Sequence, residues 1–311
     1  MRVGIAGPGA IGLFLCYCLT RQKTALAPPV LIDRNKSRIR KLRQTGFTVI
    51  SSGRKISISP RLFTVTARTE PLDIVFVTTK SLDLGPILQK LNRRAGSRNT
   101  VVVLGNGILN PERLAKIYSR GPLLFGSFLA GADRIEETTV AGHDAGQGPM
   151  LIIHKNSRYH EEAGRLSELL NQAKIAHSFH QGDVADLLWT KNAYLCAIGP
   201  VSVLLGKTNG QILESEPAFE IAQTAMSETL AVLKSMNRRP AFFEQDPLGG
   251  LRQILKNTGA NRSSMLQDAL RGKKTELDLI VKPFLNAART HGVACPTLDA
   301  LYAMVKAYLG K

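Results

Sequence analysis

The chain has 311 residues, of which 44% are hydrophobic and 21% are charged, and it contains four cysteines. This composition is typical of an ordinary soluble globular protein, and the length suggests about two domains with a sizeable core. The cysteines form no C-x-x-C pair, so we expect reduced thiols, a cytoplasmic protein and no metal site. The apolar stretch after Arg2 holds four glycines and a proline within residues 4–12, so we expect neither a signal peptide nor a membrane span.

The formal net charge of +17 has three interpretations. It can gather anionic ligands, such as a phosphorylated cofactor and a carboxylate substrate. It can also bind nucleic acid, or it can be a solvated basic surface. Lys and Arg are spread along the chain, with the longest cluster at residues 34–43. This spread favours a solvated surface first, ligand steering second and a nucleic-acid partner last.

The first twelve residues carry the clearest motif. An apolar stretch of strand length leads into a full G-x-G-x-x-G, and a helix-like apolar run follows. In a dinucleotide-binding turn, Gly7 permits the tight turn, Gly9 lets a pyrophosphate approach, and Gly12 lets the helix pack close to the strand. The anion lies on N–H groups at the helix N-terminus. The predicted cofactor-binding residues of this turn are Gly7, Pro8, Gly9, Ala10, Ile11 and Gly12.

The end of the next predicted strand, residues 30–33, carries conflicting cofactor signals. Asp33 stands where an acidic residue holds the ribose 2′-OH of NAD, although it can also be a turn or helix-cap residue. Arg34 follows at once, and its planar guanidinium matches the 2′-phosphate of NADP. The basic residues beyond Arg34 favour NADP (as NADPH), and Asp33 keeps NAD as an alternative.

The rest of the pattern predicts an α/β protein. Residues 73–80 and 100–104 are typical of buried parallel strands, residues 47–66 of short alternating strands, and the pattern is helical after Gly182. We predict a Rossmann doubly wound parallel sheet in a dinucleotide-binding domain at 1–182, followed by an all-helical substrate domain at 183–311.

Two polar residues follow predicted strands of this sheet. Lys80 and Asn106 both come at the carboxyl ends of parallel strands, where open α/β sheets bind ligands. We therefore predict that both lie at the ligand site. The alternatives are a solvated lysine and a turn asparagine.

A lysine stands on the apolar side of the predicted helix at 183–205. Lys191 comes four residues after Leu187 and four before Leu195 on a stripe of helical spacing. Burying an ammonium is costly and lowers its pKa, which suits it to proton transfer near neutral pH. The alternative is a lysine that extends its charge to the surface. The stripe comprises Val184, Leu187, Leu188, Tyr194, Leu195 and Ile198.

Two later segments resemble helix starts. Ser264 and Gln267 have the spacing of a capping box, and Thr275 and Asp278 have a capping-like spacing. From the residues alone, the interpretation of Ser264 and of Glu276 as parts of helix starts is favoured over a functional one.

Taken together, these motifs resemble the ketopantoate reductase (2-dehydropantoate 2-reductase) family over essentially the whole chain. The segment S-S-M-L-Q-D followed by T-E-x-D is specific, whereas the glycine motif is shared with many dehydrogenases. The residues that carry the resemblance are G-P-G-A-I-G at 7–12, Thr79-Lys80, Asn106-Gly107, Trp189-Thr190-Lys191, S-S-M-L-Q-D at 263–268, T-E-L-D at 275–278 and H-G-V-A-C-P at 291–296.

The resemblance implies an NADPH-dependent reduction of a 2-keto acid, in a cleft between a Rossmann domain and a helical domain. By this resemblance Lys191 is the catalytic lysine that protonates the carbonyl oxygen, and Glu276 orients it and contacts the substrate and cofactor. Ser264 binds the substrate, Asn106 lies near the nicotinamide ribose and the lysine, and Lys80 lies by the cofactor. A positive donor at the developing alkoxide stabilises the transition state more than the ground state.

The chain departs from the family at positions that are usually polar. Asparagines are usual four and eight residues after the catalytic lysine, where this chain has Leu195 and Gly199. Where the family usually has an Asn-Gly pair shortly after T-E-x-D, this chain has Val281 and Lys282. Where the family usually has an asparagine two residues after the late proline, this chain has Leu298. Loss of polar contacts can cost on the order of 10⁴ in recognition of a substrate hydroxyl.

Three functions therefore remain open. The first is reduction of 2-dehydropantoate to pantoate for pantothenate biosynthesis. The second is reduction of another 2-keto acid by a diverged relative. The third is a non-catalytic protein that senses a dinucleotide or binds nucleic acid. We also expect a homodimer.

Overall fold

The computed structural model describes residues 1–21, 27–66, 72–93, 99–143 and 150–310. Its chain divides into two compact units. Unit 1 comprises Met1–Gly105 and Asn110–Gln181, and unit 2 comprises Asn106–Leu109 and Gly182–Lys311. The short segment Asn106–Leu109, which we predicted as part of the first domain, thus belongs to unit 2. A single boundary in the sequence cannot represent such an excursion of the chain.

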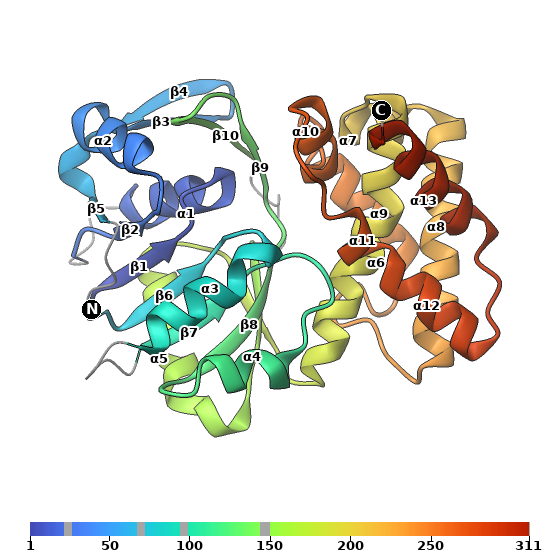
Figure 1. Ribbon diagram of the computed structural model, residues 1–311, viewed down its shortest axis with the longest axis horizontal. Coiled ribbons are helices and arrows are strands. Elements are labelled where there is room, and N and C mark those ends of the chain that lie inside the picture. Colours follow the sequence, from blue (N-terminus) through green and yellow to red (C-terminus); the bar gives the residue numbers. More distant parts are fainter. Residues whose placement is uncertain (22–26, 67–71, 94–98, 144–149, 311) are drawn as a thin grey trace. The chain divides into compact units, whose positions relative to one another are not determined.

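Within the described residues, an eight-stranded sheet forms the centre of unit 1, in the order β12-β11-β8-β7-β6-β1-β2-β5 (Figure 1). Its neighbouring strands are parallel except β11 and β8, which are antiparallel. The predicted Rossmann sheet is confirmed, with this one antiparallel pair. The strands are β1 (Val3–Ala6), β2 (Val30–Ile32), β5 (Thr64–Thr66), β6 (Ile74–Val77), β7 (Thr100–Val103), β8 (Leu123–Phe128), β11 (Leu151–His154) and β12 (His177–His180).

A second sheet of four strands, in the order β4-β3-β10-β9, packs on helix α1 (Ala10–Thr20). A Cβ atom placed on Gly142 of β10 would lie 2.1 Å from ring carbons of Phe14, so glycine is required for this close approach. The alternating pattern at 47–66 predicted the strands but not their division between two sheets. The strands are β3 (Phe47–Ser51), β4 (Arg54–Ile58), β9 (Gly131–Arg134) and β10 (Thr139–His143).

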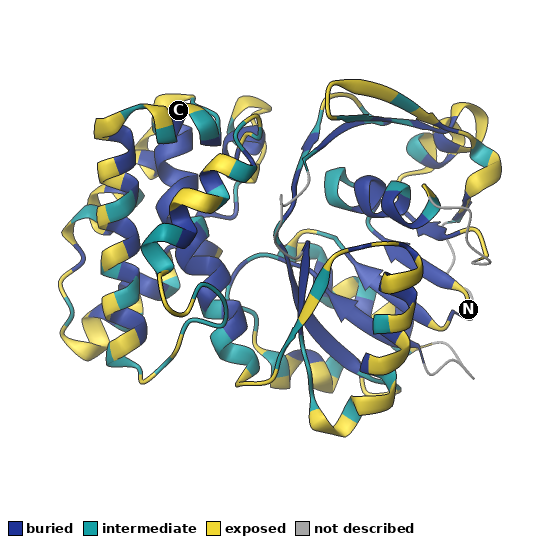
Figure 2. Cartoon of the chain, turned by 180° about the vertical axis from the view of Figure 1, so that it is seen from behind, coloured by how far each residue is buried: buried dark blue, intermediate teal, exposed yellow. Residues whose placement is uncertain are grey.

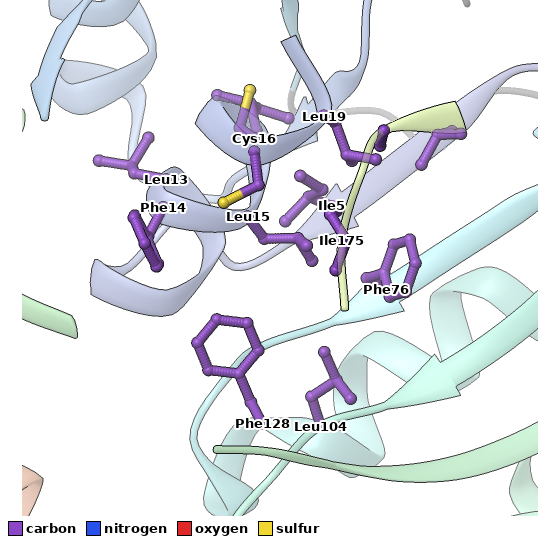
Figure 3. Packing of buried hydrophobic residues seen from close by; sticks show 14 of the residues in the cluster. Ile5, Leu13, Phe14, Leu15, Cys16, Leu19, Phe76, Leu104, Phe128 and Ile175 are labelled. Carbon is purple, nitrogen blue, oxygen red and sulfur yellow. The ribbon is translucent and has the colours of Figure 1, made fainter. Parts of the chain in front are cut away.

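The core of unit 1 lies between α1 and the main sheet (Figure 3). Ile5, Phe76 and Leu104 come from the strand region and pack in one cluster with Phe14 and Leu15 of α1, all at most 2% exposed. Alternate residues of the same strands, such as the valines of β7, are buried as well. Burial of both sheet faces explains why these strands are continuously apolar. The other helices are α2 (Lys36–Thr45), η1 (Pro60–Leu62), α3 (Ser81–Asn92), α4 (Pro111–Ile117), η2 (Ser157–Tyr159) and α5 (His160–Gln172).

Helices are the only regular secondary structure among the described residues of unit 2, as predicted. Its helices are α6 (Val184–Leu205), α7 (Asn209–Glu214), α8 (Glu216–Ser235), α9 (Pro247–Asn257), α10 (Ser264–Leu270), α11 (Leu277–Ile280), α12 (Lys282–His291) and α13 (Pro296–Leu309). None of the helices in the described part of the chain has both the length and the apolar composition needed to cross a bilayer.

Helix α6 is the central helix of unit 2. The Asp183 side chain caps its start by accepting from the Ala185 N–H, and Gly206 ends it with φ +64°. The helix contacts α7, α8, α10, α11 and α13, and nearly every residue from Thr190 to Val203 is buried (Figure 2). The predicted single apolar stripe is therefore wrong, because a helix surrounded by others has no polar face; Val184 and Leu195, which we placed on that stripe, are only half-buried.

Candidate active site

The three glycines of the turn in unit 1 differ in what an added Cβ atom would meet. At Gly7, which has φ +91°, it would lie 3.0 Å from the backbone nitrogen of Thr79, and at Gly12 2.5 Å from the Gly7 oxygen. At Gly9 the nearest backbone atom would be 3.8 Å away. The chain's own packing thus requires Gly7 and Gly12, whereas Gly9 leaves backbone open for a ligand, as a phosphate-binding turn needs.

The N-terminus of α1 adds to this fit. Gly9 is its N-cap, no side chain caps it, and its first turn holds no acidic residue. The positive end of the helix dipole is therefore available for an anion. A guanidinium nitrogen of Arg134, on β9, lies 3.3 Å from the position of a Cβ on Gly9. The motif search missed Arg134, because its approach depends on the second sheet.

The two cofactor-selecting candidates, Asp33 and Arg34, differ in their surroundings. Asp33 is 6% exposed and forms an ion pair with Arg38, and its Oδ1 accepts from the Asn35 N–H at 3.1 Å. Burial raises the pKa of Asp33, but the hydrogen bonds from Arg38 and Asn35 together lower it by more, so the pKa lies below its ordinary range. Arg34 has a 74% exposed side chain and pairs with Asp83 at 2.9 Å.

Lys80 lies between the end of β6 and the start of α3. It is exposed and is the N-cap of α3, with extended backbone, and its carbonyl oxygen accepts from the Asp83 N–H at 2.9 Å. The lysine thus shares its helix start with the carboxylate that pairs with Arg34.

The catalytic candidates Lys191 and Glu276 are both buried in unit 2, at 7% and 8% exposure. Asn106 joins them, because its Nδ2 donates to Oε2 of Glu276 at 3.3 Å across 170 residues of sequence. Burial lowers the pKa of Lys191 to about 8, against an opposing effect of the Glu276 charge, which raises it. A buried amine with this pKa exchanges a proton readily near neutral pH.

The structure changes the assignment of the helix starts near the two remaining candidates. Ser263, not Ser264, is the N-cap of α10, and its Oγ accepts from the Leu266 N–H at 3.1 Å. Ser264 is the first helical residue and its side chain is exposed, so the predicted capping role of Ser264 is wrong. Glu276 is the N-cap of α11 without a capping side-chain bond.

Three of the four positions that depart from the family pattern are well packed. Val281 and Leu298 have no exposed surface and belong to the apolar core of unit 2. A Cβ on Gly199 would lie 3.1 Å from Cε of Met265. The side of α6 one and two turns beyond Lys191 is therefore apolar.

In the described part of the chain, the four cysteines are buried free thiols, and no group of three or more His, Cys, Asp or Glu side chains could hold a metal ion.

Two family models match the chain. The ketopantoate reductase PanE/ApbA model matches residues 3–154, and the ketopantoate reductase PanE/ApbA C-terminal model matches residues 183–309. A 2-dehydropantoate 2-reductase of Archaeoglobus fulgidus is 30% identical over 241 residues, covering 78% of each chain. One of Halobacterium salinarum is 25% identical and covers 98% of each chain.

Solved structures share the fold. The PanE/ApbA family ketopantoate reductase from Ralstonia eutropha has a TM-score of 0.79 at 21% identity, covering 100% of this chain and 99% of its own. D-mandelate dehydrogenase, solved with NADH and anilino(oxo)acetate, has a TM-score of 0.80 at 18% identity over the same shares. The fold is a Rossmann-type sheet with a helical C-terminal domain, and the family models and relatives are those of an oxidoreductase. The chain belongs to the ketopantoate reductase family.

Proposed function

We propose that this chain reduces 2-dehydropantoate to pantoate with NADPH, the step that supplies pantothenate biosynthesis. The observation that carries the proposal is Lys191, a buried amine on α6 with a pKa of about 8, in electrostatic contact with Glu276. The family relation gives the substrate, since the relatives from Archaeoglobus fulgidus and Halobacterium salinarum are named 2-dehydropantoate 2-reductases.

In this proposal the bound dinucleotide supplies a hydride to the C2 carbonyl carbon of the keto acid. The Lys191 ammonium donates a proton to the carbonyl oxygen as its negative charge develops, which stabilises the transition state. Glu276 keeps the amine protonated, because its charge opposes the effect of burial. Asn106, bonded to Glu276, contacts the nicotinamide ribose and substrate, and Ser264 binds the substrate.

The cofactor assignment rests on unit 1. The Gly7–Gly12 turn holds the pyrophosphate with help from Arg134, and Lys80 contacts the dinucleotide. Because Asp33 is already neutralised by Arg38, its carboxylate repels a 2′-phosphate less than a lone carboxylate would. The Arg34–Asp83 pair is largely exposed and therefore weak, so Arg34 exchanges it for the 2′-phosphate at small cost. In a protein of the same fold, D-mandelate dehydrogenase, the dinucleotide is NADH.

A second candidate substrate is a 2-keto acid with a purely apolar side chain. Leu195 and Gly199 lie one and two turns beyond Lys191 on α6, and Met265 lies against Gly199. This surface offers no side-chain hydrogen bond to a substrate hydroxyl, and sites lacking such bonds discriminate hydroxylated substrates poorly.

The experiment is a steady-state comparison of kcat/KM with NADPH and a small panel of 2-keto acids. The proposal predicts the highest value for 2-dehydropantoate. A higher value for the branched 2-keto acid that lacks its hydroxyl would assign the second substrate class instead. Absence of NADPH oxidation with every keto acid, together with salt-sensitive polyanion binding, would favour the non-catalytic alternative.

Two further points belong to this proposal. The ketopantoate reductase of Staphylococcus aureus, which has the same fold, is described as dimeric, and this supports a homodimer. Sedimentation equilibrium at several protein concentrations tests the homodimer, and a single species of monomer mass would contradict it. A cytoplasmic location fits the four free thiols.

A further inference from the structure

Asn192 is a buried amide in the centre of unit 2 and follows Lys191 on α6. It is 1% exposed on a helix whose neighbouring positions are mostly apolar. Its Nδ2 donates to the carbonyl oxygen of Leu188 at 3.1 Å, and its Oδ1 accepts from the Gly107 N–H at 3.1 Å. Because a buried amide destabilises a protein unless it is hydrogen-bonded, the bond to Gly107 makes this asparagine tolerable in the core.

The loop that Asn192 holds is fixed from its other side as well. Gly107 has φ +84°, and a Cβ there would lie 3.3 Å from both Cβ and the carbonyl oxygen of Leu279 on α11. The loop is thus seated between α6 and α11. Asn106, the preceding residue, donates to Glu276 just before α11. Two consecutive residues of the loop therefore bond to two helical segments of the same unit.

We propose that Asn192 is a positioning residue, whose side chain ties the Asn106–Gly107 loop to α6 and so keeps the Asn106 amide on the Glu276 carboxylate. Consecutive residues on a helix point about 100° apart, so Lys191 and Asn192 can serve different partners. The effect on rate rests on the proposed function, whereas the tether itself does not.

Hydrogen exchange at Gly107 tests the tether without any substrate. Asn192→Leu keeps the branching and the number of non-hydrogen side-chain atoms and removes the acceptor, so the Gly107 amide is expected to exchange at least about tenfold faster than in the wild type. Asn209→Leu is the matched control, because Asn209 is also buried in unit 2 and its amide bonds to Thr258 instead. Unchanged exchange at Gly107 in Asn192→Leu would overturn the proposal.

A double-mutant cycle tests the route to the active site. Asn192→Leu is expected to lower kcat/KM about tenfold, and combining it with Asn106→Ala should add nothing to the loss caused by Asn106→Ala alone. Asn209→Leu should instead act independently of Asn106→Ala. If the double variant lost kcat/KM by the product of the two single losses, the proposal would be overturned. A residue that acts through Asn106 cannot lower kcat/KM further once the Asn106 amide is gone.

Gly107→Ala is a second variant that keeps the test decisive if Asn192→Leu fails to fold. Its Cβ pushes the loop from the α11 side, so it too should lower kcat/KM without adding to Asn106→Ala. If the wild type reduces no keto acid, the proposed function fails while the exchange experiment still decides the tether.

Discussion

The glycine turn of unit 1 is formed by six consecutive residues, whereas unit 2 brings together side chains that lie far apart in the chain, those of Asn106, Lys191 and Glu276 (the Lys191 cluster). In the turn, Gly7 and Gly12 are required by steric contacts with their own neighbours. In the cluster, Asn106 and Glu276 meet across 170 residues. The first arrangement is set by local backbone geometry, and the second by the packing of a whole helical unit.

Because of this difference, the two regions are sensitive to different kinds of substitution. At Gly7 and Gly12 of the turn an added side chain would meet backbone atoms, whereas at Gly9 it would occupy the space left for a ligand. The cluster depends on the charge and position of single side chains, since a buried charge responds strongly to its neighbours. Substitutions in the turn should therefore act on cofactor binding and stability, and substitutions in the cluster on the chemical step.

Lys191→Ala should have the largest effect of these substitutions, and it should affect the chemical step but not cofactor binding in unit 1. Loss of the proton donor is expected to lower kcat at least about a hundredfold, while the dissociation constant of NADPH barely changes. Lys234→Ala, at an exposed position of α8, is the matched control and should keep wild-type turnover. Steady-state kinetics and NADPH fluorescence titration measure the two quantities. Near wild-type turnover of Lys191→Ala would remove Lys191 from the chemistry.

Gly9→Ala and Gly12→Ala should separate ligand binding from stability within the turn. At Gly12 the added Cβ meets backbone at 2.5 Å, so the free energy of unfolding should fall by about 1–3 kcal/mol. At Gly9 it meets mainly the movable end of Arg134, so Tm should stay close to wild type while NADPH binding weakens. Thermal unfolding and NADPH titration give both values. Unchanged NADPH affinity of Gly9→Ala would contradict a pyrophosphate at this turn.

Arg34→Ala and Arg134→Ala should have smaller effects of different kinds. Arg34→Ala is expected to weaken NADPH binding by about tenfold, about the worth of one charged hydrogen bond, and NADH binding hardly at all. Arg134→Ala should weaken both, because the pyrophosphate is common to the two dinucleotides. The comparison needs four dissociation constants at one ionic strength. Equal losses of NADPH and NADH in Arg34→Ala would show that Arg34 does not read the 2′-phosphate.

The same contrast explains how much the sequence could predict. The strand, the turn and α1 were predictable from the glycine motif and the apolar runs on either side of it, because apolar periodicity and glycine spacing act locally. The all-round burial of α6 was not, since it depends on helices that are distant in sequence. The membership of Asn106 in unit 2 was missed for the same reason.

At the candidate site, Lys191 was predicted because a charge in an apolar pattern is unusual. Asn192 was missed, although a second polar residue beside Lys191 was a usable signal. Arg134 carried no signal, because only the pairing of β9 with β10 brings its strand to the glycine turn.

The pH dependence of kcat/KM, measured with saturating NADPH from pH 6.5 to 10, tests the role of Lys191 most directly. In the proposed mechanism the protonated amine is the donor, so kcat/KM should be level below the pKa of about 8 and fall about tenfold per pH unit above it. Because the Glu276 charge raises that pKa, Glu276→Gln should move the fall to lower pH. A profile that stays level to pH 10 in the wild type would contradict proton donation by Lys191.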